Sequence, residues 1–312
     1  MPINIKFVAF AIGLYALLLC GCGQRESRLT EFLPSNSNMV ILVNWSAVRK
    51  DPGLMRVING QLYEAQIRRF GIDETKLREL AVFGMIRAET QGGLIFRGTF
   101  DARQTLAALR SQGWSEESIE GHKVFSSGKD FAAAPDDDVL IAGTRDGVAT
   151  SLRALKNSKE SLTTSASFKK MRTALSPGKK PIAAFLLAPD NSIEIVDSML
   201  SVAGGALSLF DAGGIADILK KLNIASGVGF SIARGKNENC AVSFSVLLRD
   251  EKTAEIAANS LSFIKELSAM ASLNSGSKKD EQAIRDFTVT REKETLLLHM
   301  QIPESVFNTP TQ

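Results

Sequence analysis

Two segments that each end in an aspartate constrain the fold of this chain more than any other feature. Leu94–Asp101 and Ser243–Asp250 both read as strands, and each is followed by a stretch with helical periodicity that its aspartate is suited to cap. The neighbouring elements occur in the same order around both segments, although residue identity is low. The sequence therefore predicts an internal duplication that rests on element order.

The alternation of hairpins with single helices predicts the fold class. It favours α+β units with antiparallel sheets and packed helices over a doubly wound parallel fold. We expect two tandem repeats, each large enough for a core of its own. The expected layout is a signal peptide at 1–21, a lipidated tether at 22–35, a first α+β repeat at 36–157, a linker at 158–180, a second α+β repeat at 181–308 and a tail at 309–312.

Periodicity and turn residues give the expected elements. The expected strands are Met39–Trp45, Leu80–Ile86, Leu94–Phe100, His122–Ser127, Phe131–Ala134 and Val139–Ala142, then Ile182–Ala188, Gly227–Ala233, Ala241–Leu248, Phe287–Thr290 and Thr295–Ile302. The expected helices are Pro52–Phe70, those capped by Asp101, Thr144 and Asp250, a short piece at Phe168–Leu175, Ile193–Leu222, and a last helix beginning at Pro303.

The amino-terminal residues are predicted to form a secretory leader. Lys6 is followed by a 13-residue apolar run, Phe7–Leu19, which ends in small residues. A permanent transmembrane anchor is the alternative, but the run is shorter than the roughly 20 residues that span a bilayer core. We therefore expect the protein to be exported.

The end of the leader, Leu19-Cys20-Gly21-Cys22, resembles the bacterial lipobox. The resemblance implies that Cys22 is the lipidation site, that cleavage follows Gly21, and that fatty acyl chains such as palmitate hold the protein at a membrane. Cleavage by a general signal peptidase is the alternative. In a Gram-negative host, Gly23 after the cysteine resembles lipoproteins sent to the outer membrane, where the body would face the periplasm or the cell surface.

Cysteine content then limits how the body is stabilised. After cleavage the cysteines are Cys22, which would carry lipid, and Cys240, so we expect no intramolecular disulfide. Cys240 starts an alternating strand and should face inward as a small apolar side chain, in preference to acting as a reactive thiol.

The first unit also resembles a bacterial family of exported proteins without an established activity. The resemblance covers about Leu33 to Leu175 and implies an exported α+β fold, with no ligand or catalytic residue to carry over. Its motifs are Leu33-Pro34, the strand that follows, Phe70-Gly71-Ile72-Asp73, Phe96-Arg97-Gly98-Thr99-Phe100-Asp101 and Val139-Leu140-Ile141-Ala142-Gly143.

Charge and composition exclude several functions. The chain has 37 Lys and Arg against 34 Asp and Glu, a net charge of +3, which is too little to predict a nucleic-acid partner. With 2 His and 3 Cys, a His/Cys metal cluster is not expected either. We expect no cofactor, because the sequence has no P-loop and no dinucleotide-binding glycine motif.

The catalytic motifs are incomplete. Ser231 lies in the nearest match to a nucleophile elbow, but the final glycine is missing, and His299 is the downstream histidine. Asp136–Asp138 could hold calcium, although a solvated hairpin turn is the favoured interpretation. His122 and His299 occupy roughly corresponding positions and could form a paired site, but structural roles are favoured. We therefore expect the protein not to be an enzyme.

One segment stands apart and is the candidate contact site. Across the 22 residues Ser198–Leu219 the charges are Asp211 and Asp217, and glycines occur in two pairs. Such apolar surface could meet a membrane, a lipid or a partner, whereas two packed helices broken at the glycine pairs are the alternative. The candidate contact residues are Leu200, Leu207, Leu209 and Phe210.

Together these features predict a non-enzymatic envelope lipoprotein that acts as a binding or assembly scaffold. Its partners would be the membrane, through the lipid anchor, and an envelope protein. A carrier that encloses a lipid or another apolar ligand between sheet and helices is the alternative. An enzyme with a site assembled from distant residues is the third possibility.

Overall fold

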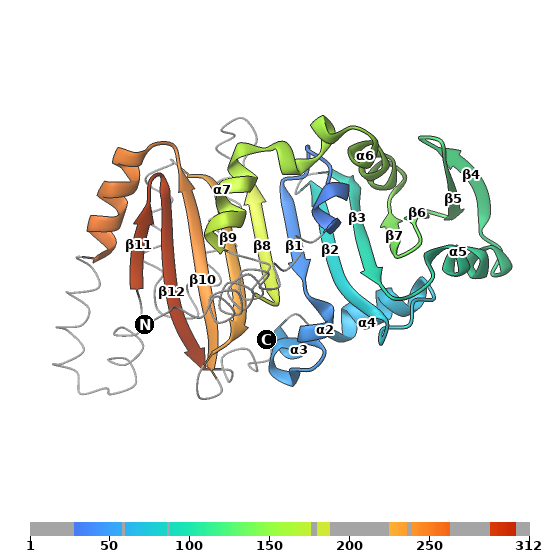
Figure 1. Ribbon diagram of the computed structural model, residues 1–312, viewed down its shortest axis with the longest axis horizontal. Helices are drawn as coiled ribbons and strands as arrows, with labels where there is room; N and C mark the ends of the chain where they lie inside the picture. The colour runs from blue at the N-terminus through green and yellow to red at the C-terminus, as the bar shows by residue number, and fades with distance from the viewer. Residues whose placement is uncertain are drawn as a thin grey trace, which may run out of the picture.

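The computed structural model describes residues 28–57, 60–85, 88–175, 180–187, 225–235, 239–262 and 288–303. Within these ranges twelve strands form one continuous antiparallel sheet (Figure 1), in the order β11-β12-β10-β9-β8-β1-β2-β3-β7-β6-β5-β4. The fold is thus α+β with an antiparallel sheet, as the hairpin pattern predicts. The two halves join where β1 pairs with β8, so they share the sheet instead of forming separate layers.

The first half of the sheet contains seven strands, with helices before, between and after them. Its elements are η1 (Arg28–Phe32), β1 (Met39–Val43), α2 (Trp45–Val48), α3 (Pro52–Val57), α4 (Gly60–Arg69), β2 (Leu77–Met85), β3 (Ala88–Gly98), α5 (Ala102–Ser111), β4 (Ser115–Ile119), β5 (His122–Ser127), β6 (Asp130–Asp136), β7 (Val139–Gly143) and α6 (Arg145–Lys156).

The second half contributes five strands. Two short 3-10 turns and a helix connect it to the first half: η2 (Ser158–Glu160), η3 (Leu162–Thr164) and α7 (Ala166–Leu175). Its strands are β8 (Ile182–Leu187), β9 (Ala225–Arg234), β10 (Asn239–Leu248), β11 (Thr288–Glu292) and β12 (Thr295–Pro303), and a helix over residues 251–262 follows β10.

The strand orders of the halves correspond. Moving outward from the β1–β8 pair, the first half reads β1-β2-β3-β7-β6 and the second reads β8-β9-β10-β12-β11, with a helix after both β3 and β10. This is the order that a duplicated unit requires. A common origin of the halves, and the boundaries given above, remain predictions.

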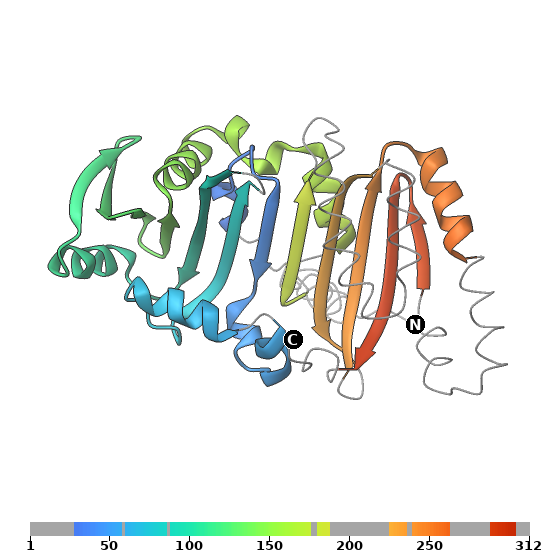
Figure 2. The same ribbon diagram turned by 180° about the vertical axis from the view of Figure 1, so that it is seen from behind.

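Both faces of the sheet are covered, which buries its strands on two sides. On the α6–α7 face, η1, α6 and α7 cover a core that runs from Ile95 in the first half to Phe185 in the second. On the opposite α2–α5 face (Figure 2), helices that include α3 and α4 cover a core that runs from Phe96 to Phe244. Because each core crosses the β1–β8 pair, packing links the halves into one body.

Helix α7 sits very close to the second half of the sheet. A Cβ at Gly229 would lie 2.7 Å from Leu175 Cδ1, and one at Gly227 would lie 2.5 Å from Met171 Sδ. Real Cβ contacts are essentially never this short, so α7 can pack this closely only because positions 227 and 229 are glycine. We call these two residues the glycine seat of α7. Phe168 completes the contact with an edge-to-face packing on Phe185, with ring centroids 5.2 Å apart.

The predicted helix caps are confirmed. The Asp101 carboxylate accepts the backbone N–H of Gln104 at 2.9 Å, and the Thr144 hydroxyl accepts that of Gly147 at 3.1 Å. Asp250 accepts the N–H of Thr253 at 2.8 Å. This bond, with the Thr253 hydroxyl, holds the pKa of the Asp250 carboxyl below its usual value.

Several local expectations are wrong in detail. Trp45 does not extend β1 but begins α2, because the Asn44 side chain caps the helix there. Strand β4 has a polar sequence and was not expected from apolar periodicity. Pro303 is the last residue of β12, where a helix start is the prediction. The expected helices at 193–222 and beyond 303 lie outside the described residues.

Candidate functional site

The residues singled out by the sequence lie mostly outside the described ranges. Cys22 precedes the first described residue, Arg28, and the candidate contact segment falls between the described Leu187 and Ala225. Its residues Leu200, Leu207, Leu209 and Phe210 therefore remain predicted contacts. None of the helices in the described ranges is long and apolar enough to cross a bilayer.

A row of polar side chains crosses the second half of the sheet. Ser243 in β10 pairs with Ser231 in β9 on one side and with His299 in β12 on the other, which puts all three on the α6–α7 face. The Nδ1 atom of His299 lies 2.8 Å from the Ser243 hydroxyl oxygen. The sheet register thus brings together Ser231 and His299, the serine and the histidine that sequence reasoning weighed as a catalytic pair.

The surroundings of His299 favour the neutral form of its imidazole ring. Burial lowers the pKa of His299, and the nearby positive charge of Lys180 lowers it further. A neutral ring can either donate to or accept from the Ser243 hydroxyl, depending on its tautomer. His299 is therefore held as an uncharged hydrogen-bonding partner at neutral pH.

The serines of the row are poorly placed for nucleophilic attack. Ser231 is 0% exposed and Ser243 is 5% exposed. Ser231 lies in the middle of β9, whereas a nucleophile elbow needs a sharp turn from a strand into a helix. Its hydroxyl and that of Ser245 have no hydrogen-bond partner within the described part of the chain. The serine hydrolase arrangement is therefore not assembled here.

The two histidines do not form a common site. His122 lies in β5 and His299 in β12, which are the eleventh and second strands of the sheet order. With strands about 4.8 Å apart, nine strand spacings separate the residues by roughly 40 Å. Within the described ranges, no group of three His, Cys, Asp or Glu residues could hold a metal ion.

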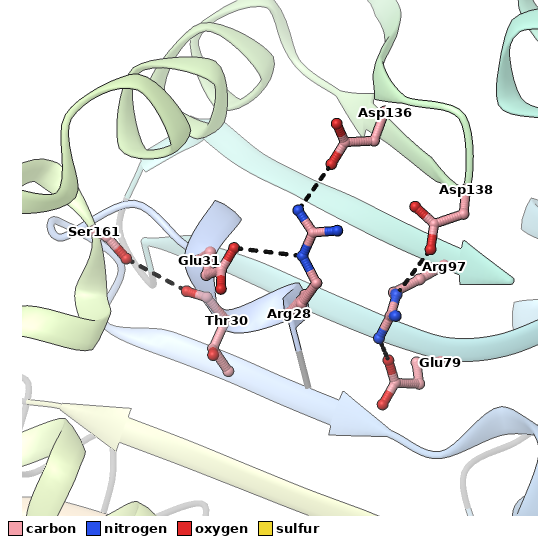
Figure 3. A network of polar contacts seen from close by, with 8 residues as sticks. All are labelled: Arg28, Thr30, Glu31, Glu79, Arg97, Asp136, Asp138 and Ser161. Carbon is pink, nitrogen blue, oxygen red and sulfur yellow. Dashed lines mark hydrogen bonds and ion pairs between the residues drawn. The ribbon is translucent and has the colours of Figure 1, made fainter. Parts of the chain in front are cut away.

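Asp136, Asp137 and Asp138 lie at the β6–β7 turn, and each pairs with a different arginine. Asp136 accepts from Arg28 at 3.4 Å, and Asp138 accepts from Arg97 at 3.1 Å (Figure 3). Asp137 pairs with Arg103 at 2.8 Å. Each carboxylate thus has its own arginine, so the turn ties β3, α5 and η1 together. This arrangement agrees with the hairpin-turn interpretation and leaves the calcium alternative without a converging set of ligands.

Arg97 pairs with two carboxylates at once, because it contacts Glu79 as well as Asp138. Its guanidinium donates to Glu79 in β2 at 3.0 Å as well as to Asp138, and its side chain is 27% exposed. Partial burial opposes its charge, but the hydrogen bonds and the charges of Asp138 and Glu79 outweigh burial and raise the Arg97 pKa. Arg97 therefore remains charged and serves as a polar clamp between β2 and the β6–β7 turn.

The amino-terminal end of the body is fastened to the α6–α7 face. In η1, Leu29 is 2% exposed and Phe32 is 0% exposed, so both side chains enter the core. Just after it, Leu33 O accepts from Leu162 N at 2.8 Å, and the Ser161 hydroxyl donates to Thr30 O at 3.4 Å (Figure 3). The first described segment thus joins the connection between α6 and α7.

Helices α6 and α7, taken with the connection between them, carry a positive charge that motif searching missed. Residues 145–175 contain seven Lys and Arg against two Asp and Glu, a net charge of +5. Net charge counted over the whole chain hides this concentration, because the chain sums to +3. A window count of charge would have revealed it.

Comparisons with known proteins show a structural similarity. No family model matches the chain, and no curated protein matches it. Crystal form I of TP0453 is similar with a TM-score of 0.49 and 12% identity, covering 91% of this chain and 96% of that one. Crystal form III of TP0453 has a TM-score of 0.47 and 12% identity, covering 88% and 94%.

Proposed function

We propose that this protein is a lipid-anchored envelope lipoprotein whose folded body acts as a non-enzymatic binding or assembly scaffold. The observation that carries the proposal is the Leu19-Cys20-Gly21-Cys22 motif at the end of a 13-residue apolar run. A buried segment begins soon after it, because Leu29 is already in the core. The chain therefore passes from a lipid site to a packed body within a few residues.

The arrangement of the body supports a scaffold. A sheet covered on both faces offers a rigid surface, and two of its polar residues make structural contacts: Arg97 links β2 to the β6–β7 turn, and His299 hydrogen-bonds to Ser243. Rigid elements are the usual platform for recognition surfaces. The scaffold would bind another envelope component while its anchor holds it at the membrane.

Replacing Cys22 tests the anchor. In cells that express the Cys22→Ala variant, the protein should leave the membrane fraction or accumulate as an uncleaved precursor, because no thiol remains to be lipidated. Cys20→Ala is the matched control, since Cys20 departs with the leader and its loss should change nothing. Membrane retention of a mature Cys22→Ala protein would contradict the proposal.

Partner binding is tested at the predicted contact segment. Crosslinking in intact cells, followed by mass spectrometry, should recover an envelope component with the wild-type protein. The double variant Leu207→Ser and Phe210→Ser should lose that component while its thermal unfolding stays close to wild type, because exposed apolar residues contribute little to stability. A variant that unfolds would instead show that these residues belong to a core.

A further inference from the structure

The layer formed by α6, η2, η3 and α7 differs in charge from the rest of the molecule. It carries a net charge of +5 over residues 145–175, so the remainder of the chain sums to −2. The layer covers the α6–α7 face and crosses both halves of the sheet (Figure 1). Positive charge is therefore gathered on a continuous surface.

Three exposed lysines contribute to the charge that remains, which is +2 once the three glutamates that pair with the layer from outside are counted. Arg145, Arg153 and Lys170 pair with Glu117, Glu120 and Glu294, which lie on β4, after β4 and between β11 and β12. Three lysines from α6, η2 and α7 are exposed and make no ion pair with another described residue. These are Lys156, Lys159 and Lys169.

The amino-terminal segment places the same layer nearest to a lipid anchor. Ser35 N donates to Glu160 O at 2.7 Å, next to the Leu33–Leu162 bond, so the start of the body is fixed at η2 and η3. Cys22 lies six residues before Arg28, a distance of at most about 20 Å for an extended chain. The tether is thus too short for the body to lie far from the bilayer.

We propose that the α6–α7 face docks on an anionic lipid surface through Lys156, Lys159 and Lys169. The inference rests on the proposed lipid anchor, which holds the body at the membrane and leaves the lysines to set which face meets the bilayer. Electrostatic attraction decays over about 10 Å at moderate salt, so the short tether keeps the lysines where the attraction acts. The opposite face of the sheet is then left for a protein partner.

The test measures the orientation of the lipidated protein on vesicles. A donor dye is placed on the α6–α7 face at Ala166→Cys or on the opposite face at Ala107→Cys, both exposed positions. Energy transfer to a headgroup-labelled lipid is compared between phosphatidylcholine vesicles and vesicles that also contain phosphatidylglycerol. We expect stronger transfer from position 166 than from 107 on anionic vesicles, and loss of that preference on neutral vesicles or at high salt.

Charge variants identify the docking residues. Lys156→Gln, Lys159→Gln and Lys169→Gln together should lower the docked-to-undocked ratio about 100-fold, at about fivefold per lysine. The matched control neutralises three exposed basic residues of the α2–α5 face and should leave the orientation unchanged: Lys50→Gln, Arg110→Gln and Lys252→Gln.

The outcomes separate the two proposals. Equal transfer from positions 166 and 107, or a preference that survives on neutral vesicles, overturns docking while flotation with the vesicles upholds the anchor. A preference that appears only after an acidic protein is added also overturns docking on lipid. Failure of the wild-type protein to float overturns both the anchor and the docking.

Discussion

The two halves of the sheet support their covering helices in different ways. In the first half, α6 rests on large side chains such as Ile95 and Ile141, into which Val148 and Leu152 pack. In the second half, α7 rests on Gly227 and Gly229, and its own Met171 fills the space. The start of α6 also approaches bare backbone, since a Cβ on Gly147 would lie 2.8 Å from the Gly92 carbonyl carbon, and α7 also packs on the large side chain of Phe185. The two helices thus differ in where they meet bare backbone: at the first turn of α6, and at Met171 and Leu175 of α7.

The two halves should therefore be sensitive to different substitutions. Bulky strand residues can lose volume and leave a cavity, whereas a glycine seat can only be overfilled. Because both cores cross the β1–β8 pair, damage to either helix should reach the whole sheet.

Truncation of the aromatic contact under α7 should have the largest effect. Phe168 is 0% exposed and packs on Phe185, so Phe168→Ala should lower the free energy of unfolding by about 3–5 kcal/mol. Leu152→Ala in α6 is the counterpart, at about 2–5 kcal/mol. Denaturant unfolding should show one cooperative transition shifted by both variants. Two transitions, each shifted by one variant, would show that the halves unfold separately.

Filling the glycine seat should have the next largest effect. Gly229→Val would force Cβ and its methyl groups into Leu175, Met171 and the Ala184 carbonyl, which should cost about 1–3 kcal/mol. Gly229→Ala should cost less, because a single methyl group demands a smaller shift. Thermal unfolding of both variants measures the effect, and an unchanged Val variant would mean that α7 is not seated on this glycine.

The helix caps should be equally important in the two halves. Asp101→Ala removes the acceptor for Gln104 N and should cost about 1 kcal/mol. Asp250→Ala removes the corresponding bond to Thr253 N and should destabilise the protein in the same direction. Asn at either position should retain most of the stability, because its side-chain oxygen can still cap. A large loss at one cap and none at the other would argue against equivalent units.

The smallest effect concerns pH and is confined to the second half. Because the pKa of His299 is lowered in the fold, the unfolded chain binds its proton more readily, and the stabilising contribution is complete above the unfolded value near 6.5. Stability should decline as pH falls below that value, until the folded pKa is passed. His299→Gln should remove this part of the pH dependence, measured by denaturant unfolding at several pH values. A steeper decline in the variant would contradict the assignment.

The sequence predicts most of the described strands and the capped helices, because their signals are local. Asp101, Thr144 and Asp250 each provide a capping oxygen just before a helical repeat, and the structure confirms all three caps. Alternation within β9 and β10 identified the hairpin, and Cys240 is buried as expected. Residues that are close together in the chain determine such features, so a single sequence is enough to predict them.

Long-range geometry was not predictable in the same way. Alignment from the two caps matches Phe96 with Ser245, yet Phe96 lies on the α2–α5 face and Ser245 on the α6–α7 face. The register shift opposite Leu247 and Leu248 does not explain this difference, because its extra residue, Ser226, lies in β9, and β10 keeps its alternation through Leu248. The union of both halves into one sheet depends on backbone pairing of β1 with β8, which no side-chain pattern specifies.

For the candidate sites, too, the sequence shows the residue types but not which residues lie close together in space. Sequence reasoning identified Ser231 and His299 separately, but the register of three strands was needed to place them in one row with Ser243 between them. The exposed lysines of the α6–α7 face were not singled out from the sequence, and their position beside the start of the body depends on the contact of Leu33 with Leu162. Spatial proximity, not residue type, was the missing information.

The mass of the amino-terminal peptide tests the central claim most directly. The protein is extracted from membranes with detergent and digested, and the peptide that begins the mature chain is measured by mass spectrometry. The account predicts a peptide that starts at Cys22 and carries the added mass of a diacylglyceryl group with or without a further acyl chain. A mature chain that starts at another residue, or at Cys22 without acyl mass, would contradict the account.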